Sequence, residues 1–126
     1  MSPLKITSRE AVTGPVLEIH GELDYAHAAE LRDLLTTLTL QPGQRLVLDL
    51  AGMDFCDSSG ITALIAARHH ADAAQADVAL AAVPARTLRV LRMVGLDQVF
   101  PLHPDSVAAT RPSADTDDSI GRTPTA

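Results

Sequence analysis

Hydrophobic and polar residues follow one another along the chain in blocks that predict alternating strands and helices. Residues 4–9 and Val16 to His20 show the two-residue alternation or short apolar run of a strand, and Thr13-Gly14-Pro15 between them has the composition of a turn. Because a link this short joins antiparallel neighbours, the sequence predicts an N-terminal β-hairpin. Gly21 is expected to end the second strand, and the carboxylate of Asp24 to cap the next helix.

One helix is predicted before a buried strand in the sequence, and a second helix is predicted after it. The first spans residues 26 to about 39, where leucines recur at three- and four-residue intervals and form one apolar stripe. The stripe consists of Leu31, Leu34, Leu35 and Leu38. Residues 46–50 are almost continuously apolar, which is typical of a central strand covered on both faces. A loop carrying Asp54 and Asp57 is expected next, and then an alanine-rich second helix that ends near Ala76.

The last third of the chain predicts one more buried strand, a third helix and two short elements. Val78 to Val83 is uninterrupted and apolar, Pro84 suits the first turn of a helix, and Gly95 suits the end of one. The core-facing positions of this helix are expected to be Leu88, Leu91 and Val94. Residues 99–102 contain a proline and are restricted to an edge strand or an extended segment. Residues 105–110 predict a short final helix.

This order of elements predicts a single α/β domain. Strands that alternate with helices favour a mostly parallel mixed sheet with helices packed against it, preceded here by the hairpin. The domain is expected to cover residues 1–110. From Arg111 onward Pro, Ser, Thr, Asp and Gly dominate, so residues 111–126 are predicted to be a disordered C-terminal tail.

Composition and charge narrow the possible functions. Of the 126 residues, 10 are Lys or Arg and 16 are Asp or Glu, for a net charge of −6, and the aromatic residues are one Tyr and two Phe. Such a chain is not expected to bind nucleic acid. A single cysteine excludes an internal disulfide and a multi-cysteine metal site. The longest apolar stretch, Val78 to Ala85, is far shorter than the roughly 18–20 residues of a membrane span. With no visible signal peptide, a cytoplasmic protein is expected.

The segment from Asp54 to Gly60, between a buried strand and a helix, carries the strongest chemical signal. In one interpretation it is an ordinary turn, in which Asp57 or Ser58 caps the helix. In the other, Ser58 is a phosphate acceptor at the start of the helix. Unpaired N–H groups and the positive end of the helix dipole stabilise a phosphate there, and about −1.5 to −2 charges would be added.

Four separated segments resemble the bacterial anti-sigma factor antagonists, which are STAS domains (sulphate transporter and anti-sigma antagonist). In chain order, within residues 3–110, they are Gly21-Glu22-Leu23-Asp24, Leu46-Val47-Leu48-Asp49-Leu50, Phe55-Cys56-Asp57-Ser58-Ser59-Gly60 and Gly95-Leu96. The resemblance implies a STAS-like fold and a small non-enzymatic switch. It also implies that the partner-binding residues are Asp24, Asp57, Ser58, Ser59 and Gly60.

The resemblance further implies a phosphorylation cycle at Ser58. In that family an anti-sigma factor with a GHKL-type ATPase fold phosphorylates the serine that matches Ser58. The unphosphorylated antagonist binds this kinase and releases the sigma factor, and a PP2C-type phosphatase reverses the modification. Thr62 departs from the family pattern, because many members have glycine at that place.

Two other functions are compatible with part of the sequence. One is a STAS module that binds a small molecule or acts as a structural subunit, as in a lipid-transport or stress-sensing assembly, without a phosphorylation cycle. The other is a serine hydrolase, which is disfavoured because Gly-x-Ser-x-Gly is absent. No Walker or dinucleotide-binding loop occurs, so no catalytic residue, cofactor or metal is assigned. Cys56 is expected to be a buried, inert thiol.

Three arginines recur every third residue along the third predicted helix. They are Arg86, Arg89 and Arg92. Such a stripe is either a solvated face or a surface that steers an acidic partner toward Ser58.

Overall fold

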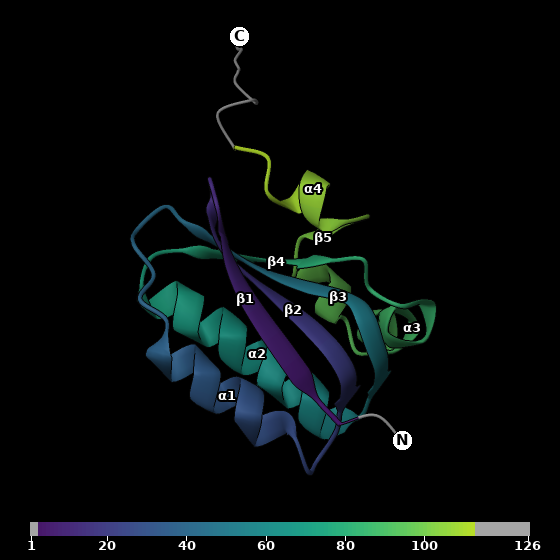
Figure 1. Cartoon of the computed structure of the whole chain (residues 1–126). Coiled ribbons are helices and arrows are strands. Elements are labelled where there is room, and N and C mark those ends of the chain that lie inside the picture. Colours follow the sequence, from purple (N-terminus) through teal and green to yellow (C-terminus); the bar gives the residue numbers. More distant parts are fainter. Residues whose placement is uncertain (1–2, 113–126) are drawn as a thin grey trace, which may run out of the picture.

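The predicted N-terminal hairpin is present in the computed structural model, which describes residues 3–112 (Figure 1). Strand β1 (Lys5–Ala11) pairs antiparallel with β2 (Gly14–Leu23). The next strands add in chain order, each parallel to the one before, to give the order β1-β2-β3-β4-β5 within the described residues. They are β3 (Arg45–Cys56), β4 (Asp77–Ala81) and β5 (Leu102–His103). The predicted α/β class with a mixed, mostly parallel sheet is confirmed.

Helices cover both faces of this sheet. Helices α1 (Ala28–Thr37) and α2 (Ser58–Ala73) lie side by side on one face (Figure 1). Helix α3 (Ala85–Met93) and the short 3-10 helix η1 (Leu96–Gln98) follow β4, and their residues Leu91 and Leu96 contact the same core. Helix α4 (Ser106–Ala109) packs on the opposite face. Right-handed crossovers between consecutive parallel strands place α1, α2 and α3 on the same face, whereas α4 follows the last strand and is not part of a crossover.

Alternation along β3 separates the two cores. Leu46, Leu48 and Leu50 are buried in the large core against α1 and α2, whereas Val47 points to the other face and packs with Ala109 of α4. The predicted leucine stripe of α1 belongs to the large core. Two of its members are fully buried and two are half-buried. Burial of a leucine side chain contributes about 1.5–3 kcal/mol.

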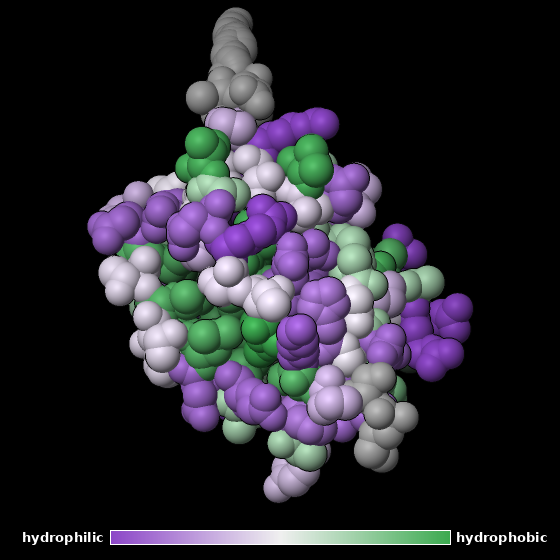
Figure 2. All heavy atoms as spheres, viewed as in Figure 1, coloured by the Kyte–Doolittle hydropathy of each residue, from purple (hydrophilic) through white to green (hydrophobic). Residues whose placement is uncertain are grey.

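The core is partly exposed between α1 and the edge strand β1. Ile6, Leu34 and Leu38 are half-buried there, and Figure 2 shows apolar atoms between the two elements.

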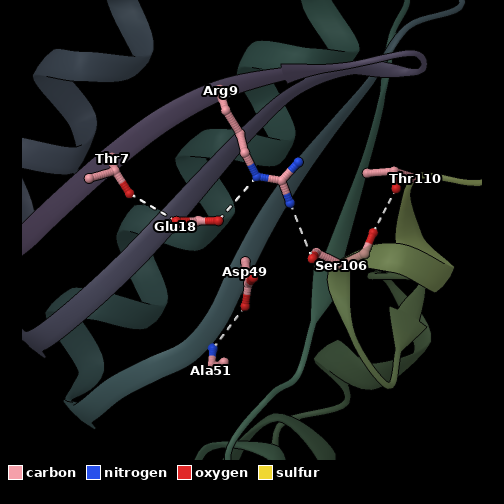
Figure 3. Close-up of polar contacts among 7 residues, drawn as sticks. All are labelled: Thr7, Arg9, Glu18, Asp49, Ala51, Ser106 and Thr110. Carbon is pink, nitrogen blue, oxygen red and sulfur yellow. Dashed lines mark hydrogen bonds and ion pairs between the residues drawn. The ribbon is translucent and has the colours of Figure 1, made fainter.

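The opposite face of the sheet is polar near β1. The hydroxyl of Thr7 and the guanidinium of Arg9 both donate to the carboxylate of Glu18 (Figure 3). These two hydrogen bonds, first that of Arg9, hold the pKa of Glu18 below its ordinary value. Arg9 also donates to Ser106 Oγ at 3.2 Å, and this bond links the hairpin to α4.

Strands β2 and β3 are longer than the sequence predicted. Gly21 does not end β2, which continues to Leu23, and Asp54 lies inside β3 and not in a loop. Both differences have one cause. The two strands pair in parallel to their last residues, Leu23 with Cys56, although the register shifts near Gly21. Pairing with a neighbour therefore overrides the low strand propensity of Gly52 and Asp54.

Helix α3 also differs from its prediction. Leu91 is buried and Leu88 is half-buried, but Val94 is 60% exposed and Thr87 takes a buried position instead. The helix ends at Met93, and Gly95 has the positive φ of +79° that turns the chain away. Val94 therefore belongs to the exposed end of the helix.

The remaining predictions concern the end of the chain and membranes. The short last helix is present as α4, and an edge strand is present as β5, although of the predicted residues 99–102 only Leu102 belongs to it. The predicted disordered tail, residues 111–126, lies outside the described residues from position 113 onward. Between residues 3 and 112, no helix has the length and apolar character that spanning a membrane requires.

Candidate functional site

The candidate site forms where β2 and β3 end next to each other. Leu23 pairs with Cys56, so the residues that follow them, Asp24 and Asp57, begin two adjacent turns. The amide N–H of Asp57 points to the carbonyl of Leu23, with 3.4 Å between nitrogen and oxygen. The parallel pairing thus brings together two of the segments on which the resemblance rested, 21–24 and 55–60.

Asp57 joins these two turns through both of its carboxylate oxygens. Oδ1 accepts a hydrogen bond from the amide of Gly60 at 3.1 Å, which makes Asp57 the N-cap of α2. Oδ2 accepts from the amide of Tyr25, also at 3.1 Å. Of the two candidates for the cap, Asp57 and Ser58, the structure therefore assigns this role to Asp57.

Ser58 is the first residue of α2 and is exposed. Its hydroxyl makes no hydrogen bond within residues 3–112, and its carbonyl accepts one from Thr62 Oγ1 at 3.0 Å. The amides of Ser58 and Ser59 belong to the first turn, where the helix itself provides no acceptor. Ser59 is half-buried. A group attached to the Ser58 hydroxyl would meet solvent and these amides.

Gly60 allows α2 to begin directly against the end of β2. It is buried, and a Cβ at this position would collide with the carbonyl oxygen of Leu23 and stand 2.6 Å from Cys56 Sγ. Because the nearest obstacle is backbone, it cannot move aside as a flexible side chain would. The close approach of helix and strand therefore requires glycine here.

Asp24 does not cap α1, contrary to the prediction. The helix begins at Ala28, and its N-cap, His27, makes no side-chain capping bond. Asp24 closes the preceding turn instead, because its Oδ1 accepts from the His27 amide at 3.1 Å and lies 2.7 Å from His27 Nδ1. Partial desolvation raises the pKa of Asp24, but the hydrogen bonds and charge of His27 outweigh it and hold the pKa below its ordinary value.

An apolar groove runs beside Ser58, between α2 and α3, and has a volume of about 520 Å³. Its apolar lining residues are Ile61, Ile65, Val90, Val94 and Leu96, and Ser58 and Thr62 stand in its wall. A smaller hollow of about 250 Å³ shares Val90 with it and adds Phe55 and Arg86. We refer to both together as the α2–α3 groove.

Sequence reasoning missed this groove. Val94 was expected in the core, Phe55 was named only as part of a segment that resembles the family, and Val90 and Tyr25 were assigned no role. Tyr25 is 85% exposed and Phe55 44%. The available signal was the four-residue spacing of Ile61 with Ile65 and of Val90 with Val94, but spacing alone does not tell a groove from a core.

Cys56 lies at the floor of the groove and is not a nucleophile. Burial, and secondly the charge of Asp57, raise the pKa of its thiol to about 12. A thiol with this pKa stays protonated at neutral pH. Among residues 3–112 there is no cluster of three or more His, Cys, Asp or Glu side chains able to hold a metal ion.

Most of the chain matches one family of known proteins. Residues 6–104 match the family model described as "Mlab, STAS domain". A STAS-domain containing protein of Pseudomonas aeruginosa (strain UCBPP-PA14) is 27% identical over 99 residues, which cover 77% of this chain and 97% of that protein.

Two solved structures are similar in fold. An anti-sigma factor antagonist from Mycobacterium paratuberculosis has a TM-score of 0.74 and 24% identity, over 86% of this chain and 95% of that one. A sulfate transporter family protein from Wolinella succinogenes has a TM-score of 0.66 and 18% identity, over 75% and 80% of the two chains. Antagonists and transporter domains thus share this architecture.

Proposed function

The chain belongs to the STAS domain family, and from this premise we propose that it is an anti-sigma factor antagonist controlled by phosphorylation of Ser58. The unphosphorylated protein binds an anti-sigma factor that has GHKL-type serine kinase activity, and this binding releases the sigma factor. Phosphorylation ends the interaction, and a PP2C-type phosphatase restores it. The protein itself performs no catalysis.

The observation that carries this proposal is the separation of two roles at the start of α2. Asp57 caps the helix and anchors the neighbouring turn, while the exposed hydroxyl of Ser58 has no hydrogen bond to any of residues 3–112. Modification of Ser58 therefore leaves the bonds that hold the site intact. The amides of the first turn and the helix dipole favour a phosphate at this place.

The same geometry explains why a phosphate would end binding. Ser58 stands in the wall of an apolar groove, next to the carboxylate of Asp57. A bound partner would have to cover a group with about −1.5 to −2 charges without water around it. A thousandfold loss of affinity needs only about 4 kcal/mol.

The test combines recovery from native cells with three variants. Wild-type protein is expected to co-purify with an ATPase-fold partner and to yield a peptide phosphorylated at Ser58. Ser58→Ala is expected to stay folded and remain in the complex, whereas Ser58→Asp is expected to bind weakly.

Ser59→Ala serves as the matched control, because it removes a neighbouring hydroxyl and leaves Ser58 available. Phosphate on Ser58→Ala protein at another residue of this segment, or loss of phosphate in Ser59→Ala alone, would refute the site.

A second candidate is a binding or scaffold subunit of a transport or stress-sensing assembly, without a phosphorylation cycle. The observation that favours it is the fold that this chain shares with the sulfate transporter family protein from Wolinella succinogenes. The two candidates differ in one measurement. For a scaffold subunit, Ser58→Asp leaves the native complex intact in size-exclusion chromatography, and Ser58 from cells carries no phosphate.

A further inference from the structure

Helix α3 carries an uncompensated positive charge on an acidic protein. The chain has a net charge of −6, yet residues 85–94 contain three arginines and no acidic residue. The arginines are Arg86, Arg89 and Arg92, and all are exposed. Within the part of the chain that the structure describes, none of their guanidinium groups makes an ion pair or hydrogen bond. Figure 2 shows strongly hydrophilic atoms over α3.

The three arginines do not face the same way. Arg86 is four residues before Val90, so the two share a face of the helix, and both line the end of the α2–α3 groove. Arg92 is two residues after Val90, about 200° around the helix, and lines a different hollow together with Leu88 and Arg89. Arg86 is therefore the arginine of the groove, and Arg92 provides an internal comparison.

The carboxylates near the groove either have other hydrogen-bond partners or lie too far from Arg86 to form an ion pair with it. Both oxygens of Asp57 accept backbone hydrogen bonds, and Asp24 is bound to His27. Asp54 lines the same hollow as Arg86 but lies beyond ion-pair distance from it. Arg86 thus presents a cation at the end of an apolar groove.

We propose that the α2–α3 groove binds an amphipathic helix of the partner protein that carries a carboxylate opposite Arg86. This inference rests on the proposed function and names the chemistry of its partner. The groove lies between two helices and has the volume of an ordinary binding site, so a third helix can insert its apolar face. The unpaired guanidinium at one end then selects an acidic residue on that helix.

An acidic partner helix also explains why phosphorylation of Ser58 would weaken binding. Ser58 lies in the wall of the groove that this helix would occupy. A phosphate on Ser58 would then face the apolar side chains of the bound helix and share the interface with its acidic residues. Like charges in a desolvated interface repel, so phosphorylation opposes the attraction that Arg86 provides.

The test uses two synthetic peptides and the full 126-residue protein. One peptide of about fifteen residues carries leucines at helical spacing and glutamates elsewhere, and the other replaces every glutamate by lysine. Methyl NMR is expected to show that the glutamate peptide shifts the Ile61, Ile65, Val90 and Val94 resonances. The lysine peptide is expected to leave them unchanged.

Matched variants test whether the charge of Arg86, and not that of another arginine of α3, attracts the peptide. Arg86→Glu is expected to weaken binding of the glutamate peptide about tenfold, whereas Arg92→Glu, with the same change of charge, is expected to change it by less than about twofold. Ser58→Asp is expected to weaken it as well. Equal losses for Arg86→Glu and Arg92→Glu would show a general charge effect and overturn the proposal.

A second measurement uses the native partner. A photo-crosslinking residue at Val94 is expected to capture an acidic, amphipathic segment, whereas one at Val107 of α4, which is 69% exposed, is not. Crosslinking to a basic segment overturns the inference, as does Arg86-dependent binding to phosphatidylglycerol vesicles in place of the glutamate peptide. Phosphate on Ser58 in cells, with neither peptide bound, would leave the proposed function standing and remove this inference alone.

Discussion

The surroundings shift the pKa values of two side chains of the site, Asp24 and Cys56, in opposite directions. Hydrogen bonds and the charge of His27 keep Asp24 ionised against partial desolvation. Burial, and then the charge of Asp57, keep Cys56 protonated. At the residue scale, Cys56 therefore adds no charge to the surface next to Ser58, and a phosphate on Ser58 would add about −1.5 to −2 charges to it.

Cys56 is expected to resist alkylation in the folded protein. Its pKa is raised from 9.0 to about 12, so the thiolate fraction near pH 8 falls by roughly three powers of ten. Reaction with iodoacetamide should be at least about a hundredfold slower than in guanidinium-unfolded protein. Equal rates in the two states, followed by mass spectrometry, would contradict the burial of this thiol.

The Asp24–His27 contact predicts a specific acid response. Because the folded pKa of Asp24 is lowered, its contribution to stability is complete above roughly pH 4 and is lost as the pH falls through the folded value. In His27→Ala the pKa of Asp24 should rise toward its ordinary value, as measured by carboxyl-carbon NMR. The pKa of Glu18, which Arg9 and Thr7 lower, should not change and serves as the control.

At the scale of elements, the start of α2 is fixed to its neighbours from two directions. Asp57 attaches it to the turn between β2 and α1, and Gly60 lets it lie against the last residues of β2. The helix N-terminus is therefore part of a rigid junction of β2, β3 and α2. A phosphate there can change the surface without moving an element.

Loss of the Asp57 carboxylate is expected to destabilise the protein. Asp57→Ala removes the cap of α2 and the acceptor for Tyr25, so the free energy of unfolding should fall by about 1–3 kcal/mol. Urea denaturation measures this change. Asp54→Ala removes an exposed carboxylate three residues earlier and should cost less than about 0.5 kcal/mol. A similar loss of unfolding free energy in both variants would show that the charge of Asp57, and not its two hydrogen bonds, is responsible.

The whole molecule divides into two faces with different connections. The large core joins the sheet to α1, α2 and α3, and the candidate site lies on this side. On the other face α4 is attached through a small core, through the hydrogen bond from Arg9 to Ser106 (Figure 3) and through hydrogen bonds from Arg45. Arg45 donates to the carbonyls of Ala109 and Arg111 at 2.7 and 2.9 Å.

This division predicts that α4 can be loosened without effect on the site. Arg45→Met keeps the apolar part of the side chain but removes the two hydrogen bonds that Nη1 donates. The free energy of unfolding should fall by about 1–2 kcal/mol. Hydrogen exchange should rise in residues 105–111 and stay unchanged in residues 57–62. Arg68→Met, which breaks an exposed pair with Asp72 on α2, should leave α4 protected. Faster exchange around Ser58 in Arg45→Met would contradict the separation of the two faces.

The order of elements and several local roles follow from the sequence alone. The hairpin, the leucine stripe of α1, a start of α2 at Asp57 or Ser58 and the stop at Gly95 all depend on residues within about one helical turn or one strand pair. Periodicity and turn chemistry report such local features directly. The predictions for the length of β3 and for the burial of Val94 were wrong because both depend on contacts outside that range. The prediction for Asp24 failed for a local reason, because its carboxylate binds His27 in the turn before α1 and does not cap the helix.

The assembly of the site was decided only in the tertiary structure. Tyr25 and Asp57 are 32 positions apart, and the groove joins residues of α2 to residues of α3 and η1. The parallel register of β2 and β3 brings the first pair together, and packing of α3 on the core brings the second. The chain by itself therefore determines which residues can carry the chemistry. Long-range pairing and packing determine which of them meet, because those contacts leave no trace in the local pattern.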